Sequence, residues 1–122
     1  METTQGKAVL AYTTLAQMSR KPMNSFATYK LFRLKKAVAP VVEFQSEQEM
    51  KLVDELGGRI TEAGMIQIDG NDKRKEYAEK HRELENMACE VDIAKIEMHM
   101  RELPDLSVAD METLDDFVTW KE

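Results

Sequence analysis

The longest helical pattern in this sequence is too long for a compact domain of its size. Apolar residues recur at helical spacing across residues 24–56, Asn24 and Ser25 are both good N-caps, and Gly57 is suited to close the helix. Unbroken, this segment would be a helix of about 50 Å. A compact chain of 122 residues has a radius of gyration of only about 14 Å. The sequence therefore predicts an elongated molecule.

Pro40 lies inside this long pattern. Proline removes the amide that would bond the carbonyl of Lys36, and its ring crowds that carbonyl, so we expect a kink or a break at this point. A break would separate a basic helix from an acidic one and let the two fold against each other. The predicted fold is mainly α: an elongated antiparallel helical hairpin with a small β-hairpin at its tip and a short C-terminal helix.

Shorter patterns fill the rest of the chain. Residues 8–18 have the spacing of an amphipathic helix, and Ile60, Ile66 and Ile68 flank a turn at Gly64 and predict the β-hairpin. A third helix is expected to start at residues 70–72. Residues 90–100 alternate as an extended segment does. The apolar positions assigned to the third helix are Tyr77, His81, Leu84, Ala88 and Val91. Those assigned to the last helix are Met111, Leu114, Phe117 and Val118. Ser107 and Asp110 predict a capping box for the last helix.

Charge is divided sharply along the chain. Residues 3–42 contain seven basic residues and no acid, whereas residues 43–122 contain ten basic and 22 acidic residues. The basic segment could pair with the acidic one, bind the phosphates of a nucleic acid, or pair with a second copy of the chain. We favour pairing within the chain, because acid is abundant and an acidic body repels nucleic acid.

The composition is typical of a single folded domain, 43% hydrophobic and 33% charged. We expect one domain over residues 1–122, with residues 1–7 flexible or loosely docked. The single cysteine, Cys89, cannot form an intramolecular disulfide. The longest uncharged stretch, residues 8–19, is shorter than a membrane span, and no signal-peptide layout is present. These features predict a protein of the cytoplasm.

No motif in the sequence indicates catalysis or metal binding. His81, Cys89 and His99 lie eight and ten residues apart, which is not a ligand spacing. Cys89 is followed by Glu90, which would raise the pKa of the thiol and weaken it as a nucleophile. We therefore predict no catalytic residue, no metal site and no cofactor, and a protein that is not an enzyme.

The candidate partner-binding residues are the basic residues of the first third of the chain and a C-terminal tryptophan that must pack on the body or on a neighbour. They are Arg20, Lys21, Lys30, Arg33, Lys35, Lys36 and Trp120. The nine methionines are interpreted as core residues in preference to an adaptable docking surface.

Several short motifs together resemble a family of small phage- and prophage-encoded proteins of Gram-positive bacteria whose function is unknown. They cover about four-fifths of the chain in order. The motifs are Tyr29-x-Leu31-x-x-Leu34-Lys35-Lys36, Pro40-Val41-x-x-Phe44, an acidic helix ending at Gly57, a hairpin centred on Gly64, Glu90-Val91-Asp92-Ile93, and Leu106-Ser107 followed by Leu114-Asp115-x-Phe117. The resemblance implies a phage origin and a non-enzymatic role. The expected location is then the cytoplasm of the host cell, with virion association as an alternative.

These observations lead to one function hypothesis and two alternatives. The first is a phage accessory protein that binds a partner protein of the host or the phage, with inhibition of a host antiviral defence system as the expected effect. The alternatives are a minor virion or tail-assembly component, and a nucleotide-sequestering anti-defence protein. We also expect a homo-oligomer, no membrane association and no binding to nucleic acid.

Overall fold

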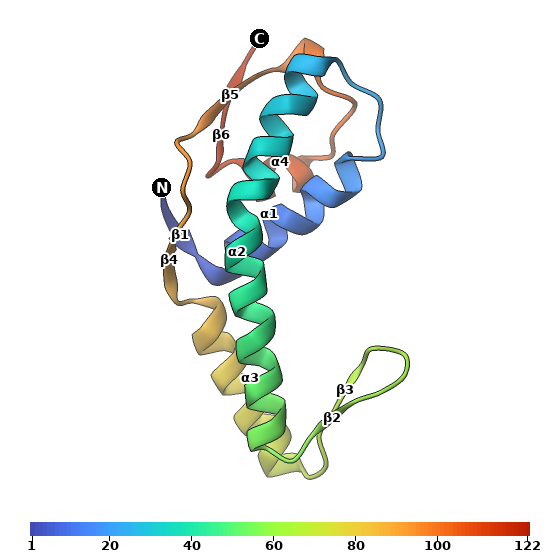
Figure 1. Cartoon of the computed structure of the whole chain (residues 1–122), viewed down its shortest axis with the longest axis vertical. Helices are drawn as coiled ribbons and strands as arrows, with labels where there is room; N and C mark the ends of the chain where they lie inside the picture. The colour runs from blue at the N-terminus through green and yellow to red at the C-terminus, as the bar shows by residue number, and fades with distance from the viewer.

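The computed structural model describes every residue, Met1–Glu122, and is organised around one long helix (Figure 1). Four α-helices follow one another along the chain: α1 (Gln5–Met18), α2 (Ser25–Glu55), α3 (Asn71–Glu85) and α4 (Val108–Leu114). Helix α2 runs almost the full length of the molecule, α1 packs across its N-terminal half, and α3 runs beside its C-terminal half (Figure 1). The expected fold class, mainly α and elongated, is confirmed.

Three two-stranded sheets connect segments of the chain. Strand β1 (Glu2–Thr4) pairs antiparallel with β4 (Ala88–Glu90), and β2 (Arg59–Ile60) pairs antiparallel with β3 (Ile66–Gln67). Strand β5 (Ile96–His99) runs parallel to β6 (Val118–Lys121), and a 3₁₀ turn, η1 (Met100–Glu102), follows β5. The β2–β3 hairpin is the predicted one, and it projects from the connection between α2 and α3 (Figure 1).

Of the kink or break expected at Pro40, the break does not occur. Helix α2 is continuous from Ser25 to Glu55 with Pro40 inside it. Val38 and Val41 on either side of the proline are buried, whereas Pro40 and Lys36 face solvent. Packing therefore holds both halves of the helix in line, and the carbonyl that loses its amide partner lies on the side where water can replace it. The basic and acidic parts of residues 24–56 therefore form one helix and do not fold against each other.

The end of α2 follows the expected pattern. Gly57 has φ 68°, the left-handed conformation that glycine adopts without strain. The amide of Gly57 donates to the carbonyl of Asp54 at 3.1 Å, and the amide of Gly58 donates to that of Val53 at 2.8 Å. These two bonds form a Schellman motif, which satisfies carbonyls that the helix end would leave unpaired.

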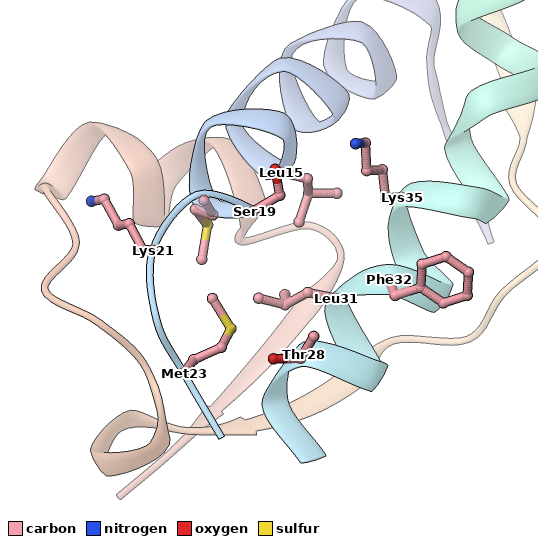
Figure 2. A pocket seen from close by; sticks show the side chains of 9 residues that line it. Leu15, Ser19, Lys21, Met23, Thr28, Leu31, Phe32 and Lys35 are labelled. Carbon is pink, nitrogen blue, oxygen red and sulfur yellow. The ribbon is translucent and has the colours of Figure 1, made fainter. Parts of the chain in front are cut away.

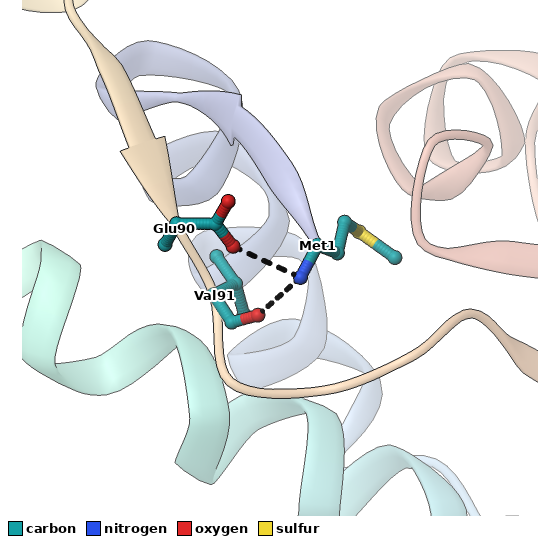
Figure 3. A network of polar contacts seen from close by, with 3 residues as sticks. All are labelled: Met1, Glu90 and Val91. Carbon is teal, nitrogen blue, oxygen red and sulfur yellow. Dashed lines mark hydrogen bonds and ion pairs between the residues drawn. The ribbon is translucent and has the colours of Figure 1, made fainter.

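Residues 1–7, for which we expected a flexible or loosely docked segment, lie against the body of the protein. They form β1 and the first turn of α1. The amino group of Met1 donates to the carbonyl oxygen of Val91 at 2.7 Å and forms an ion pair with Glu90 at 3.2 Å (Figure 3). Thr4 caps α1 by accepting a hydrogen bond from the amide of Lys7. The strand pairing partner lies about 86 residues away, beyond the reach of any local sequence pattern.

Two predicted helices end earlier than their apolar patterns suggested. Helix α3 stops at Glu85, so Ala88 lies in β4 and Val91 follows that strand. Helix α4 stops at Leu114, and Val118 begins β6. The capping box of α4 is confirmed, since the Ser107 hydroxyl accepts from the Asp110 amide and the Asp110 carboxylate accepts from the Ser107 amide.

The core is concentrated at one end of the molecule. Fourteen buried residues form the main cluster. They come from α1, α2, β5, α4 and β6 and from the segments that follow β4 and α4, and Leu34, Val38, Met98 and Phe117 are fully buried. A separate cluster of Leu52, Leu56 and Ile68 lies at the other end of α2. None of the four helices combines the length and the apolar composition that a membrane span requires.

Candidate protein-binding surface

The N-terminal half of α2 has an apolar outer side as well as an apolar inner side. Its inner side contributes Ala27, Leu31, Leu34 and other residues to the main core. On the outside, the side chains of Phe26, Tyr29 and Phe32 are 76%, 60% and 57% exposed. Scattered exposed apolar residues are ordinary, but three large aromatic side chains within two turns of one helix form a patch, and such patches mark interaction sites.

Two exposed basic residues lie among these aromatic side chains. Arg33 and Lys36 follow Tyr29 at helical spacing, and the guanidinium carbon of Arg33 lies 5.9 Å from the centroid of the Tyr29 ring. This distance is that of a cation–π contact, which orders both side chains. We call Phe26, Tyr29, Phe32, Arg33 and Lys36 the aromatic–basic face.

A shallow groove runs beside this face. It has a volume of about 440 Å³ and lies between α2 and the segment that follows β4. Four of its lining residues come from the aromatic–basic face, and Asp92 is its one acidic residue. The full lining is Tyr29, Phe32, Arg33, Lys36, Ala37, Pro40, Asp92 and Ile93.

The predicted partner-binding residues lie in different environments. Arg33 and Lys36 belong to the aromatic–basic face, and Arg20 is exposed in the connection after α1. The ammonium group of Lys30 donates to the carbonyl of Glu97 in β5 at 2.8 Å and that of Lys21 to the carbonyl of Asp105 at 3.2 Å. Lys35 lies 5.4 Å above the ring of Tyr12. Lys30 therefore helps to attach β5 to α2, whereas the side chains of Arg20, Arg33 and Lys36 are exposed and form no hydrogen bond within the chain.

Trp120 belongs to the body of the protein. It lies in β6, is half-buried and packs against the main core. Its indole N–H donates to the carboxylate of Asp115 at 3.1 Å. Of the two roles considered for this side chain, the structure supports packing on the body.

Pairing between the basic and acidic segments is limited to one ion pair. Lys7 contacts Asp116 at 2.9 Å, and both side chains are about half exposed. The other basic residues of the first third of the chain form no ion pair with a carboxylate. The charge of the aromatic–basic face is thus left for interactions outside the chain.

His81 joins α3 to α2. Its Nδ1 lies 2.7 Å from a carboxylate oxygen of Glu85 and its Nε2 lies 3.4 Å from one of Glu49, while its ring stacks on Tyr77 with centroids 5.5 Å apart. Burial, followed by the carboxylates of Glu49 and Glu85, raises the pKa of Tyr77 above its ordinary value of 10.0. No group of three or more His, Cys, Asp or Glu side chains is placed to hold a metal ion.

The single cysteine, Cys89, lies in β4 next to Glu90, the residue that was expected from the sequence to raise the pKa of its thiol. Burial and then the carboxylate of Glu90 raise the pKa of its thiol above the ordinary 9.0. The thiolate is the nucleophilic form of cysteine, so this environment weakens the reactivity of Cys89.

The exposed aromatic residues were missing from the candidates derived from the sequence. Phe26, Tyr29 and Phe32 lie at the N-terminal end of the long helical pattern, but their positions around the helix separate them from its buried residues. At 100° per residue, Tyr29 lies about 160° around the helix from both Ala27 and Leu31. Phe32 lies about 160° from Leu34 and about 100° from Leu31. A helical projection of residues 24–42 contains this signal.

Comparisons with protein-family models, with curated proteins and with solved structures gave no match to this chain.

Proposed function

We propose that this protein is a non-enzymatic protein-binding protein that uses the aromatic–basic face to bind an acidic partner protein. The observation that carries the proposal is the gathering of three exposed aromatic side chains with Arg33 and Lys36 on one helix. Aromatic residues and arginine contribute most of the binding energy at protein interfaces. The helix is anchored in the main core through its opposite side, so these side chains are held in place before binding.

Charge specifies the chemistry of the partner. Residues 3–42 contain no acid, and Arg33 and Lys36 have no ion-pair partner. A complementary surface would carry Asp and Glu around apolar side chains. Such complementarity raises the rate of association and excludes partners of the wrong charge.

Single-stranded nucleic acid is the competing partner for a face of this kind, because bases stack on aromatic rings and phosphates contact basic groups. The remainder of the chain, residues 43–122, carries 22 acids against ten basic residues. A polyanion approaching the face is repelled by that excess, whereas a short acidic segment of a protein can bind without lying along it. We therefore propose a protein partner.

The family resemblance supplies the biological setting of the proposal. A phage-encoded accessory protein would direct this face to a protein of the host or of the phage, and a host antiviral defence protein is the target we propose first. Action as an oligomer, including as a virion or tail component, stays a prediction, which the sedimentation mass of the purified chain would test.

Affinity capture with paired variants tests the proposal. Arg33→Glu/Lys36→Glu reverses two charges on the aromatic–basic face, and Lys51→Glu/Lys75→Glu makes the same change of net charge at exposed positions elsewhere. We expect the first variant to lose at least about 90% of a captured protein and the second to retain it. Equal recovery by both variants would refute the proposed face. Captured material that nuclease releases would refute the protein partner.

A further inference from the structure

A small apolar pocket opens between the C-terminal end of α1 and the first turns of α2 (Figure 2). Its volume is about 180 Å³. Leu15, Met18 and Leu31, which line it, are buried members of the main core, and Met23 comes from the connection between the two helices. Leu15, Met23 and Leu31 point toward the centre of the pocket (Figure 2). The pocket is therefore an opening into the side of the main core.

The pocket has the size of one side chain. An apolar cavity of about 150 Å³ binds benzene, whereas pockets for drug-sized ligands begin at about 300 Å³. One phenyl or isobutyl group would therefore occupy most of it. Met18 and Met23 contribute unbranched, flexible side chains that adapt to the shape of the group they contact.

The residues around the pocket carry positive charge and no negative charge. Lys21 and Lys35 lie on its two sides, and none of its nine lining residues is acidic (Figure 2). The wall hydroxyls of Ser19 and Thr28 already donate to the carbonyls of Ala16 and Asn24, at 2.6 and 2.9 Å. The Lys21 ammonium group donates one hydrogen bond, to the carbonyl of Asp105, and neither ammonium group forms an ion pair. The remaining N–H groups of Lys21 and Lys35 are therefore the donors left for a ligand.

Phe32 connects the pocket to the aromatic–basic face, because it lines both the pocket and the shallow groove beside that face. A segment that lies on the face can thus extend a side chain into the pocket while it stays on the surface. Acidic residues next to that side chain would approach Lys21 and Lys35.

We infer that this pocket binds one apolar anchor side chain, of the size of Phe or Leu, from an acidic segment of the partner protein. The inference rests on the proposed function and adds to it the feature by which the partner is recognised: an aromatic or branched aliphatic residue flanked by carboxylates. Buried anchors of this kind, surrounded by charges that exclude other partners, are typical of specific interfaces.

Methyl NMR of the full chain, labelled at its methionine methyl groups, tests the inference. Met18 and Met23 report on the pocket, and the other seven of the nine methionines are internal controls. The probe is the peptide acetyl-Asp-Glu-Phe-Glu-Asp-amide. We expect saturable shifts confined to Met18 and Met23, with a dissociation constant of about 1 mM. Replacing Phe by Ala in the peptide, or its acids by Asn and Gln, should weaken binding at least about fivefold.

A pair of threonine variants provides the matched control. Thr28 lines the pocket and Thr13 does not, yet both are exposed helical residues whose hydroxyl donates to the carbonyl four residues earlier, at 2.9 and 3.1 Å. Thr28→Phe places a ring at the pocket and should abolish the peptide-induced shifts. Thr13→Phe should leave them unchanged.

Three results would overturn the inference: shifts of equal size with the Ala peptide, binding unaffected by Thr28→Phe, or binding of 4-phenylbutyrate without binding of the Phe peptide. The last result would identify a site for small carboxylates in place of a protein anchor. None of these results depends on the charge-reversal capture experiment. If one of the three results is obtained while the charge reversal at Arg33 and Lys36 still abolishes capture, only the pocket inference is refuted and the proposed face stands. If the peptide binds but capture is insensitive to the reversal, the face is refuted.

Discussion

The two halves of α2 differ in how much packs against them. Around the N-terminal half, α1, α4, β5 and β6 contribute to a cluster of 14 buried residues. Around the C-terminal half the cluster has three members, and the adjacent α3 has a single buried residue, Leu84. The C-terminal half relies in addition on polar contacts, in which His81 links Glu49 on α2 to Glu85 on α3.

The proposed binding face lies on the N-terminal half of α2, which is the better-packed half. Segments with few buried apolar contacts open with a smaller free energy than the core does. A face on the N-terminal half keeps its aromatic side chains in position, which reduces the entropy lost on binding. The C-terminal half, with α3 and the β2–β3 hairpin, is expected to open locally while the binding half stays folded.

The largest effect is expected from a truncation in the main core. Leu34 is fully buried there. Leu34→Ala should lower the free energy of unfolding by about 2–5 kcal/mol, through lost burial and the cavity left behind. Urea denaturation followed by circular dichroism measures this change. A loss below about 1 kcal/mol would show that the N-terminal half is not the main source of stability.

A truncation in the smaller cluster should have a smaller and more local effect. Leu52→Ala, at a residue 6% exposed, is expected to cost about 1–3 kcal/mol, because the three-residue cluster can relax around the cavity. Hydrogen exchange should show reduced protection in α3 and in the β2–β3 hairpin, with α1 and β5 unchanged. Equal loss of protection in both halves would mean that the molecule opens as one unit.

Local sequence signals predicted the elements of both halves well. The capping box at Ser107, the glycine that closes α2 and the turn at Gly64 each act through hydrogen bonds or dihedral angles within a few residues, so each can be read from the sequence. Strand pairs β1–β4 and β5–β6 join residues far apart in the chain. No local pattern specifies such a partner, and β1 and β6 were therefore missed.

The candidate site shows the same limit. Charge identified Arg33 and Lys36, because a run without acids is visible in the sequence. The same criterion also selected Lys30, whose ammonium group instead attaches β5 to α2. Charge in the sequence does not show which residues pack against a side chain, so it cannot separate Lys30 from the exposed basic residues. The exposed position of Tyr29 and Phe32 could have been obtained from helical geometry, but only the structure shows that no other element covers them.

Pro40 lies at the middle of α2, where the two halves meet, and its replacement should stabilise the protein. Pro40→Ala restores an amide that can bond the carbonyl of Lys36 and removes the crowding by the ring. We expect a gain of about 1–2 kcal/mol in the free energy of unfolding, because the helix is already continuous and needs no rearrangement to accept alanine. Ser46→Ala, at an exposed site on the same helix, is the control and should gain no more than about 0.5 kcal/mol. Loss of stability in Pro40→Ala would show that the proline is required for the path of α2.

The smallest effect concerns Tyr77 in the C-terminal half, whose folded-state pKa is raised above 10.0 by burial and by Glu49 and Glu85. A raised pKa means that the folded protein holds the phenol proton more strongly than the unfolded chain does. The stability that this provides is complete below pH 10 and is lost as the pH rises through the folded pKa. Tyr77→Phe should therefore change stability by less than about 0.5 kcal/mol at pH 7 and make the decline of stability above pH 10 less steep. Absorbance at about 295 nm, compared between the two proteins, isolates the ionisation of this residue among the three tyrosines. If the difference titration has its midpoint at or below pH 10, the seam between α2 and α3 is open to water, and the C-terminal half is less tightly packed than its contacts imply.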